Sequence, residues 1–194
     1  MAPMEAPAST DEALLQRYAG GDASAFDELY ARHELPLWRY VLRSSRDRAA
    51  AEELTQEVWF AVAREAGRFG AEARFVPWLY TVARNRLIDR VRTTRRQVSL
   101  DEPANEDGAP RVEALVDPSG ATPEVEVETI EQGRAILAAL DALPVEQREA
   151  FVLQADAGLT VEEIATVTGT GFETAKSRLR YARERLKALL RAYA

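Results

Sequence analysis

Apolar residues recur every three or four positions along most of this chain, and this spacing constrains its fold more than any other feature. Phe26, Leu29 and Tyr30 show the spacing, and so do Leu54 and Val58. It places apolar side chains on one face of a helix, and no segment has the convincing alternation of a half-buried strand. The sequence therefore predicts an all-α fold, with helices near residues 11–19, 24–44, 47–66, 76–95, 128–142, 145–156, 160–167 and 172–191.

An acidic stretch interrupts this helical pattern. Between residues 101 and 131 there are ten acidic side chains and a single basic one, Arg111, and proline and glycine are frequent. A stretch so poor in large apolar residues cannot bury enough surface to offset the entropy lost on ordering. We therefore predict two small helical domains, residues 11–97 and 131–194, joined by a flexible acidic linker over residues 98–130, with a disordered tail at residues 1–10.

The composition excludes several kinds of site. The chain has no cysteine and one histidine, so disulfides and thiolate metal sites are impossible. His33 lies in YARHELPLW, where we expect a helix-surface or satisfied histidine rather than a ligand or base. Glu52 and Glu53 are adjacent, so on a helix they diverge and do not share a metal ion or a proton. The sequence predicts no catalytic residue, no metal and no cofactor.

The N-terminal stretch MAPMEAPASTDEALLQRY lacks the basic region and the apolar region of a signal peptide. No later apolar run approaches the length needed to span a bilayer. The absence of cysteine suits a reducing compartment. We therefore expect a cytoplasmic protein without membrane insertion.

The stretch TVEEIATVTGTGFETAKSRLRYARERLK, residues 160–187, contains the signals of a helix-turn-helix. Thr160 followed by Glu163 is a capping-box pattern, which predicts that a helix begins there. Gly169 and Gly171 can adopt the left-handed conformations of a tight turn. A second helix is expected from Phe172. Two short helices joined by a glycine-containing turn are typical of this DNA-binding motif.

The second of these helices concentrates positive charge. Residues 172–191 contain seven basic and two acidic side chains, although the whole chain has 25 basic and 32 acidic ones. At about 100° per residue, a basic stripe lies beside an apolar stripe of Ala175, Leu179, Ala182 and Leu186. In a DNA-bound motif the N-terminal part of the helix enters the major groove, and flanking arginines reach phosphates. The DNA-binding candidates are Thr174, Lys176, Ser177, Arg178, Arg180, Tyr181 and Arg183. The alternative is a solvated charged face.

The stretch FVPWLYTVARNRLIDRVRTTRR is also basic, with seven arginines and one aspartate between residues 74 and 96. One face of the predicted helix combines Trp78 with polar side chains, namely Thr81, Asn85, Asp89 and Arg92. Such a face can stack on unpaired bases and hold the backbone of a single strand. Taken alone, these residues slightly favour an alternative in which Trp78 and Tyr80 are core aromatics and the arginines are a solvated surface.

Taken as a whole, the chain resembles the extracytoplasmic-function (ECF) sigma factors, a branch of the bacterial sigma-70 family. The resemblance rests on the order of DEALLQRYAGGDASAFDELYARH, AAAEELTQEVWFAVAREAGRF, PWLYTVARNRLIDRVR, LDALPVEQREAFVL and the helix-turn-helix. It implies a transcription initiation factor, not an enzyme, that binds bacterial core RNA polymerase, recognises the minus-thirty-five and minus-ten promoter elements and promotes DNA melting. It also implies an anti-sigma factor as a partner and association with the nucleoid when active.

The resemblance also implies roles for particular residues. Core polymerase would be bound by Glu52, Glu53, Gln56 and Glu57. A flipped base of the minus-ten element would be captured by the loop near residues 67–75 and by Trp78, Thr81, Asn85, Asp89, Arg92 and Arg95. The helix-turn-helix candidates would read the minus-thirty-five element. The acidic linker would pass through the RNA exit region of the polymerase.

Two other interpretations remain open at this point. A classical dimeric helix-turn-helix regulator with an N-terminal helical sensor domain explains residues 160–187, but not the basic aromatic helix around Trp78 or the acidic linker. A homodimer on a palindromic site would favour it. An all-helical enzyme ranks last, because the glycine-containing stretch AGGDAS lacks the lysine and the spacing of a phosphate-binding loop.

Overall fold

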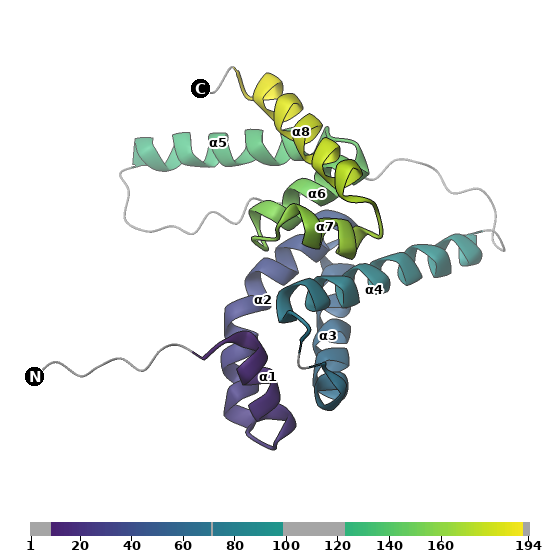
Figure 1. Ribbon diagram of the computed structural model, residues 1–194. Coiled ribbons are helices and arrows are strands. Elements are labelled where there is room, and N and C mark those ends of the chain that lie inside the picture. The colour runs from purple at the N-terminus through teal and green to yellow at the C-terminus, as the bar shows by residue number, and fades with distance from the viewer. Residues whose placement is uncertain (1–8, 71, 99–122, 192–194) are drawn as a thin grey trace, which may run out of the picture. The chain divides into compact units, whose positions relative to one another are not determined.

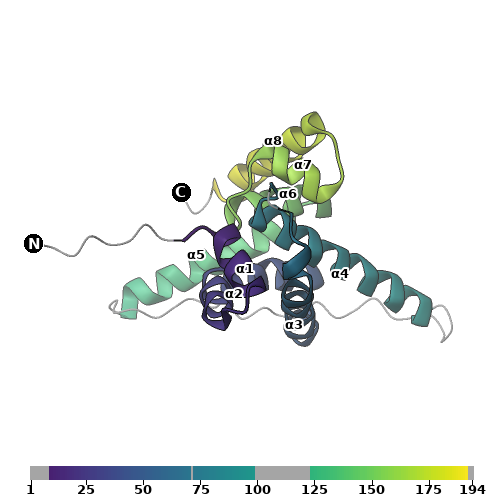
Figure 2. The same ribbon diagram turned by 60° about the horizontal axis from the view of Figure 1, so that its bottom comes forward.

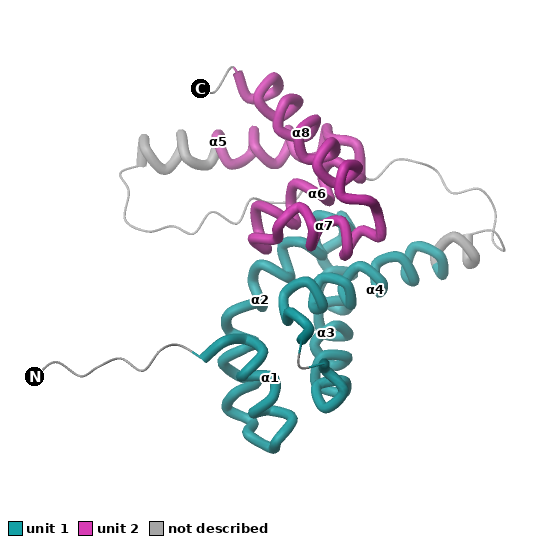
Figure 3. The backbone as a smooth tube through the Cα atoms, in the orientation of Figure 1, with its two compact units in different colours: residues 1–105 teal, residues 106–194 magenta. Residues whose placement is uncertain are grey.

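The computed structural model describes residues 9–70, 72–98 and 123–191, with side chains throughout these ranges except at residues 94–98 and 123–130. Every regular element in these ranges is helical, which confirms the predicted all-α fold. The chain divides into two compact units, residues 1–105 and 106–194 (Figure 3). Their boundary lies inside the 98–130 segment predicted to be a linker, of which residues 99–122 are outside the described ranges.

The first unit is built from four α-helices and a 3₁₀ helix, namely α1 (Asp11–Ala19), α2 (Ala23–Ser45), α3 (Arg48–Glu65), η1 (Ala66–Arg68) and α4 (Phe75–Val98). Thr10, Asp22 and Asp47 each accept a hydrogen bond from a first-turn backbone N–H, which satisfies a donor without an intrahelical partner. Hydrogen bonds from the Ser24 hydroxyl and the Arg17 guanidinium hold the pKa of Asp22 below its ordinary value. Thr10, predicted to lie in a disordered tail, is thus the N-cap of α1, and residues 1–8 lie outside the described ranges.

The core of this unit lies where α2 packs against α1 and α3, and where α4 packs against α2 and α3 (Figure 1). Its fully buried side chains include Leu14, Leu29, Leu37, Val58 and Leu79. Tyr80 of α4 is also buried and meets Tyr40 of α2 edge to face, with ring centroids 5.1 Å apart. Tyr80 is thus a core aromatic.

The second half of α4 extends beyond α2 and α3, as Figures 1 and 2 both show. Its side chains lose their cover along the way, from fully buried Ala83 to Val91, which is 51% exposed. The first half of α4 is therefore buried against its neighbours, and the second half is more exposed.

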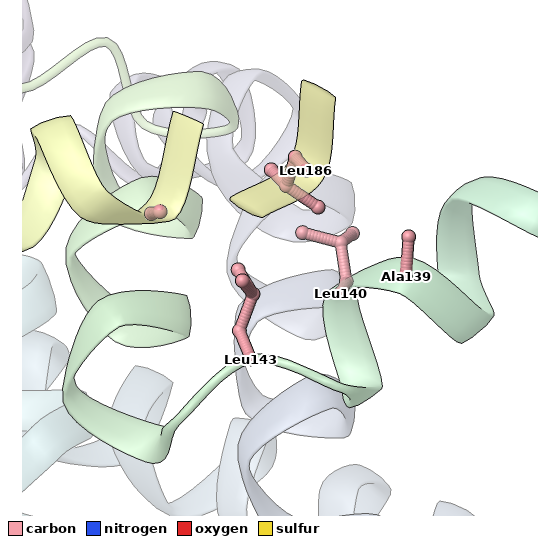
Figure 4. Packing of buried hydrophobic residues seen from close by; sticks show 5 residues of the cluster. Ala139, Leu140, Leu143 and Leu186 are labelled. Carbon is pink, nitrogen blue, oxygen red and sulfur yellow. The ribbon is translucent and has the colours of Figure 1, made fainter. Parts of the chain in front are cut away.

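The second unit contains α5 (Pro123–Asp141), α6 (Val145–Ala155), α7 (Val161–Thr168) and α8 (Phe172–Leu189). The last helix packs against the other three. One apolar cluster joins α5 to α8 through Ala139, Leu140, Leu143, Ala182 and Leu186, and Figure 4 shows Leu186 facing Leu140. A second set of buried residues, including Leu153 and Ile164, covers the inner sides of α6 and α7. Helix α8 is therefore held by its apolar face.

The helices on either side of the predicted linker are longer than the sequence indicates. Helix α4 continues to Val98, and α5 begins at Pro123 rather than near residue 128. Proline suits a first helical position, because its missing N–H would have no partner there and its fixed φ matches the helix. Residues 123–130, predicted as part of the flexible linker, are thus helical.

Arg148 of α6 is a buried charge, only 6% exposed. Its Nη1 atom lies 3.4 Å from Oδ1 of Asp141, at the end of α5. Because a buried guanidinium is costly unless it is paired, this contact stabilises the position of α6 relative to the end of α5.

Candidate nucleic-acid interface

The connection between α7 and α8 has the geometry of a helix-turn-helix. The predicted capping box is confirmed: Thr160 Oγ1 accepts from the Glu163 N–H at 3.3 Å, and Glu163 Oε2 accepts from the Thr160 N–H at 2.9 Å. Gly169 ends α7 in the left-handed region, with φ 66°. The prediction of a second left-handed glycine is wrong, because Gly171 has φ −76° and forms an extended N-cap.

The two stripes predicted for α8 are present. The four apolar residues Ala175, Leu179, Ala182 and Leu186 are all buried. The DNA-binding candidates lie outside this stripe: Ser177 and Arg178 are half-buried, and the exposed ones are Thr174, Lys176, Arg180, Tyr181 and Arg183. The surface of α8 outside its core face therefore carries the cationic side chains of the helix.

Arg180 has two neighbours within α8. Its Cζ atom lies 4.4 Å from the centroid of the Tyr181 ring, within the range of a favourable cation–π contact. Its Nη1 atom lies 3.6 Å from Oε1 of Glu184, which is an ion pair but too long for a hydrogen bond. The ring and the carboxylate thus restrain the guanidinium while the N–H donors directed at Glu184 remain uncommitted.

Lys176 has the same kinds of neighbour. Its Nζ atom lies 5.6 Å from the centroid of the Phe172 ring and 3.8 Å from Oε1 of Glu173. Phe172, 41% exposed, is missing from the predicted site, although its i, i+4 spacing from Lys176 is a signal that could have identified it.

Arg183 is oriented by another helix. Its Nη2 atom donates a hydrogen bond to Oε1 of Gln154 on α6, at 2.5 Å. Gln154 is 29 residues away in the sequence. Helical periodicity does not report such a contact, so Gln154 is also missing from the predicted site.

The predicted single-strand face of α4 begins with a group of aromatic rings. Trp78 is half-buried, with its ring centroid 5.1 Å from that of Phe69 and 6.1 Å from that of Phe75. It is therefore neither a core residue like Tyr80 nor freely exposed. Thr81, one turn later, is half-buried and donates from Oγ1 to the carbonyl oxygen of Pro77 at 2.8 Å.

The polar part of this face follows along the projecting half of α4. Asn85, Asp89 and Arg92 are all exposed. Arg92 Nη1 lies 3.9 Å from Asp89 Oδ1, so this arginine has a weak local ion pair. The side chain of Arg95 lies outside the described ones. This face of α4 thus carries a half-buried indole at one end and an exposed amide and guanidinium farther along the helix.

The polar residues predicted on α3, namely Glu52, Glu53, Gln56 and Glu57, are all exposed. Phe60 follows one turn later on the same side of the helix and is 75% exposed. It is missing from the predicted site because its spacing does not distinguish a surface aromatic from a core one. The result is an acidic helix face with an aromatic side chain at its end.

The described residues also bear on metal binding, histidine chemistry and membrane insertion. Within the described ranges, no group of three histidine, aspartate or glutamate side chains could hold a metal ion. Nε2 of His33 lies 2.7 Å from Oδ2 of Asp11, which confirms the expected satisfied histidine. None of the helices described is both long and apolar enough to cross a membrane.

Two family models match the chain, Sigma-70 region 2 over residues 29–97 and Sigma-70, region 4 over residues 133–186. The chain is 32% identical over 176 residues to the RNA polymerase sigma factor CarQ of Myxococcus xanthus, covering 91% of this chain and 95% of CarQ. It is 34% identical over 184 residues to the ECF RNA polymerase sigma factor SigK of Mycobacterium tuberculosis H37Rv, covering 92% of each. The chain belongs to the ECF sigma factors of the sigma-70 family.

Solved structures share the fold of this ECF sigma factor. CnrH, in complex with the cytosolic domain of CnrY, matches with a TM-score of 0.64 and 23% identity over 96% of this chain and 100% of CnrH. The sigma factor RpoE of Bartonella quintana, in complex with the anti-sigma factor NepR, matches with a TM-score of 0.70 and 24% identity, covering 87% of this chain and 98% of RpoE.

Family membership decides between the interpretations of the sequence. An ECF sigma factor is a transcription initiation factor, which confirms the predicted function and does not favour the dimeric regulator. Neither matched family is catalytic. The region 2 match includes the acidic face of α3 and the polar face of α4, and the region 4 match includes the cationic face of α8.

Proposed function

We propose that this ECF sigma factor binds core RNA polymerase through α3, melted minus-ten DNA through α4, and duplex minus-thirty-five DNA through α8. The observation that carries the proposal is the division of α8 into a buried apolar stripe and an exposed cationic face. In a helix-turn-helix, this second helix is the one that lies in the major groove.

On α8, exposed cations supply the two kinds of contact that a promoter needs. Arg180 has uncommitted donors and can bind the guanine O6 and N7 atoms in a bidentate manner. Arg183, held by Gln154, suits a phosphate contact that positions the helix on the duplex. Thr174, Lys176, Ser177, Arg178 and Tyr181 complete the proposed minus-thirty-five surface.

On α4, the proposed minus-ten surface consists of Trp78, Thr81, Asn85, Asp89, Arg92 and Arg95. The exposed amide of Asn85 can hydrogen-bond to the edge of an unpaired base, and the Trp78 ring can stack on one. Unpairing costs a few kcal/mol per base, which contacts with the extruded base can offset. Melting therefore requires no catalytic residue, and we infer that the protein is not itself an enzyme.

On α3, the proposed polymerase surface is the acidic face of Glu52, Glu53, Gln56 and Glu57, extended by Phe60. Acidic side chains suit a basic partner surface. An aromatic residue that is 75% exposed on a monomer is typical of the anchors that contribute most to interfaces. Phe60 is therefore proposed as the apolar anchor of this surface.

We also propose an anti-sigma factor as a partner of this chain. CnrH and RpoE, the sigma factors whose structures are compared above, were both solved in complexes, and the partner of RpoE is named as an anti-sigma factor. A flexible connection between the two units would let them rearrange around such a partner. The acidic residues of the 98–130 segment suit the RNA exit region of the polymerase. The protein would act in the cytoplasm, at the nucleoid when active.

The proposal is tested by reconstituting the holoenzyme, selecting promoters with it, and measuring base discrimination by Arg180→Ala. The expected loss is about 1–3 kcal/mol of discrimination at one upstream base. Arg134→Ala removes the same charge from an exposed position of α5. It is the matched control and should retain base discrimination. Failure to select any promoter, or equal effects of the two substitutions, would contradict the proposal.

A further inference from the structure

The only two acidic residues of α8 are Glu173 and Glu184, and each lies beside a cation that also contacts an aromatic ring. Glu184 pairs with Arg180, and Glu173 pairs with Lys176. The same three-part arrangement of cation, ring and carboxylate thus occurs twice within one helix. Both carboxylates are solvent-exposed, at 60% and 81% of their side chains.

The carboxylate beside Arg180 affects its two possible DNA ligands differently. A backbone phosphate is an anion, so bringing it to Arg180 also brings it close to Glu184, and the two like charges repel. The O6 and N7 atoms of guanine carry only partial negative charge, so the repulsion that they meet is much weaker. Because the Arg180–Glu184 ion pair is too long for a hydrogen bond, its donors remain available to a base edge.

The Tyr181 ring acts on the same guanidinium in a complementary way. A cation–π contact uses the face of the ring and restrains the side chain without consuming an N–H donor. Arg180 therefore loses less conformational freedom when it meets a base in this position. Ring and carboxylate together favour a base edge over a phosphate.

We propose that Glu184, and in the same way Glu173, is a specificity-determining residue that weakens binding of α8 to phosphates of unrelated duplex DNA. This inference rests on the proposed DNA-binding function of α8. It differs from the effect of overall charge, which is −7 for the whole chain, because it depends on carboxylates at two particular positions.

The test measures binding of the full-length chain to a fluorescein-labelled duplex of unrelated sequence, by anisotropy over a series of salt concentrations. Glu184→Gln is expected to tighten this binding about two- to five-fold at low salt, which is the scale of an exposed ion pair. It should also steepen the salt dependence, because a freed Arg180 contacts one more phosphate. Glu173→Gln should act in the same direction. Glu146→Gln, at an exposed position of α6, is the matched control for net charge.

Specificity is measured with the same variants in the reconstituted holoenzyme, on a selected promoter and on the unrelated duplex. Glu184→Gln should reduce the ratio of the two affinities, whereas Glu146→Gln should leave it unchanged. No gain for Glu184→Gln, or an equal gain for Glu146→Gln, would overturn the inference.

Arg180→Ala separates this failure from failure of the proposed function. If Arg180→Ala weakens binding but Glu184→Gln does not tighten it, the role of the carboxylate is wrong and the DNA-binding role of α8 stands. If Arg180→Ala changes binding to neither duplex, the proposed DNA-binding role of α8 fails as well.

Discussion

Arg90 of α4 donates a hydrogen bond from Nη1 to Oε2 of Glu53 on α3, at 2.5 Å. The pair joins the helix proposed to bind promoter DNA to the helix proposed to bind polymerase. Both side chains are partly exposed, at 40% and 60%, so solvent screens the interaction. A double-mutant cycle with Arg90→Ala and Glu53→Ala should give a coupling of about 0.2–1 kcal/mol in the free energy of unfolding, decreasing with salt. A coupling that is zero at low salt, or that does not change with salt, would contradict this contact.

Phe60→Ser should separate stability from binding. Because Phe60 is 75% exposed, the substitution should change the free energy of unfolding by no more than about 0.5 kcal/mol. Affinity for core polymerase should nevertheless fall about ten-fold or more, as for an interface anchor. Leu35→Ser on α2, where the side chain is 49% exposed, is the matched control. Equal polymerase affinity for both variants would remove Phe60 from the proposed surface.

Asn85→Ala should impair melting more than duplex binding. The exposed amide lies on the face of α4 proposed to hold unpaired bases, so its loss should reduce the reactivity of melted promoter thymines toward permanganate. Affinity of the holoenzyme for a duplex containing only the upstream element should stay the same. Gln16→Ala removes an exposed amide from α1 and should affect neither measurement. Equal losses of melting and upstream binding would contradict the role of Asn85.

Gly169→Ala should destabilise the helix-turn-helix, because Gly169 has φ 66°, a left-handed conformation that alanine adopts only with strain. A Cβ atom at this position would meet no other atom, so backbone strain is the whole cost. The expected cost is about 1–2 kcal/mol. Gly171→Ala is the matched control, since its φ of −76° suits alanine and a Cβ atom there meets open space. Hydrogen exchange of α8 amides measures both. Faster exchange in the Gly171 variant than in the Gly169 variant would contradict the turn geometry.

The positions of the helices were largely predictable, because apolar spacing and caps act within a few residues. The Thr160–Glu163 capping box and the buried stripe that includes Leu179 follow from such local patterns. The exception is the start of α5 at Pro123, where acidic composition suggested a linker but the chain is helical.

The candidate site was predictable only in part. Helical spacing identifies which residues share a face, so the exposed cations of α8 and the acids of α3 could be named. Helical spacing does not say which residue of another helix lies opposite. The contacts of Arg183 with Gln154 and of Arg90 with Glu53 could therefore not be predicted. Burial is also a tertiary property, which is why Tyr80 is in the core while Phe60 is exposed.

The proposed binding of this sigma factor to polymerase is tested most directly by size-exclusion chromatography of the purified chain with bacterial core RNA polymerase, without DNA and at moderate salt. We expect the chain to co-elute with core polymerase, and we expect a known sigma factor, added as a competitor, to abolish the co-elution. A chain that stays free of polymerase yet binds duplex DNA as a dimer would contradict it.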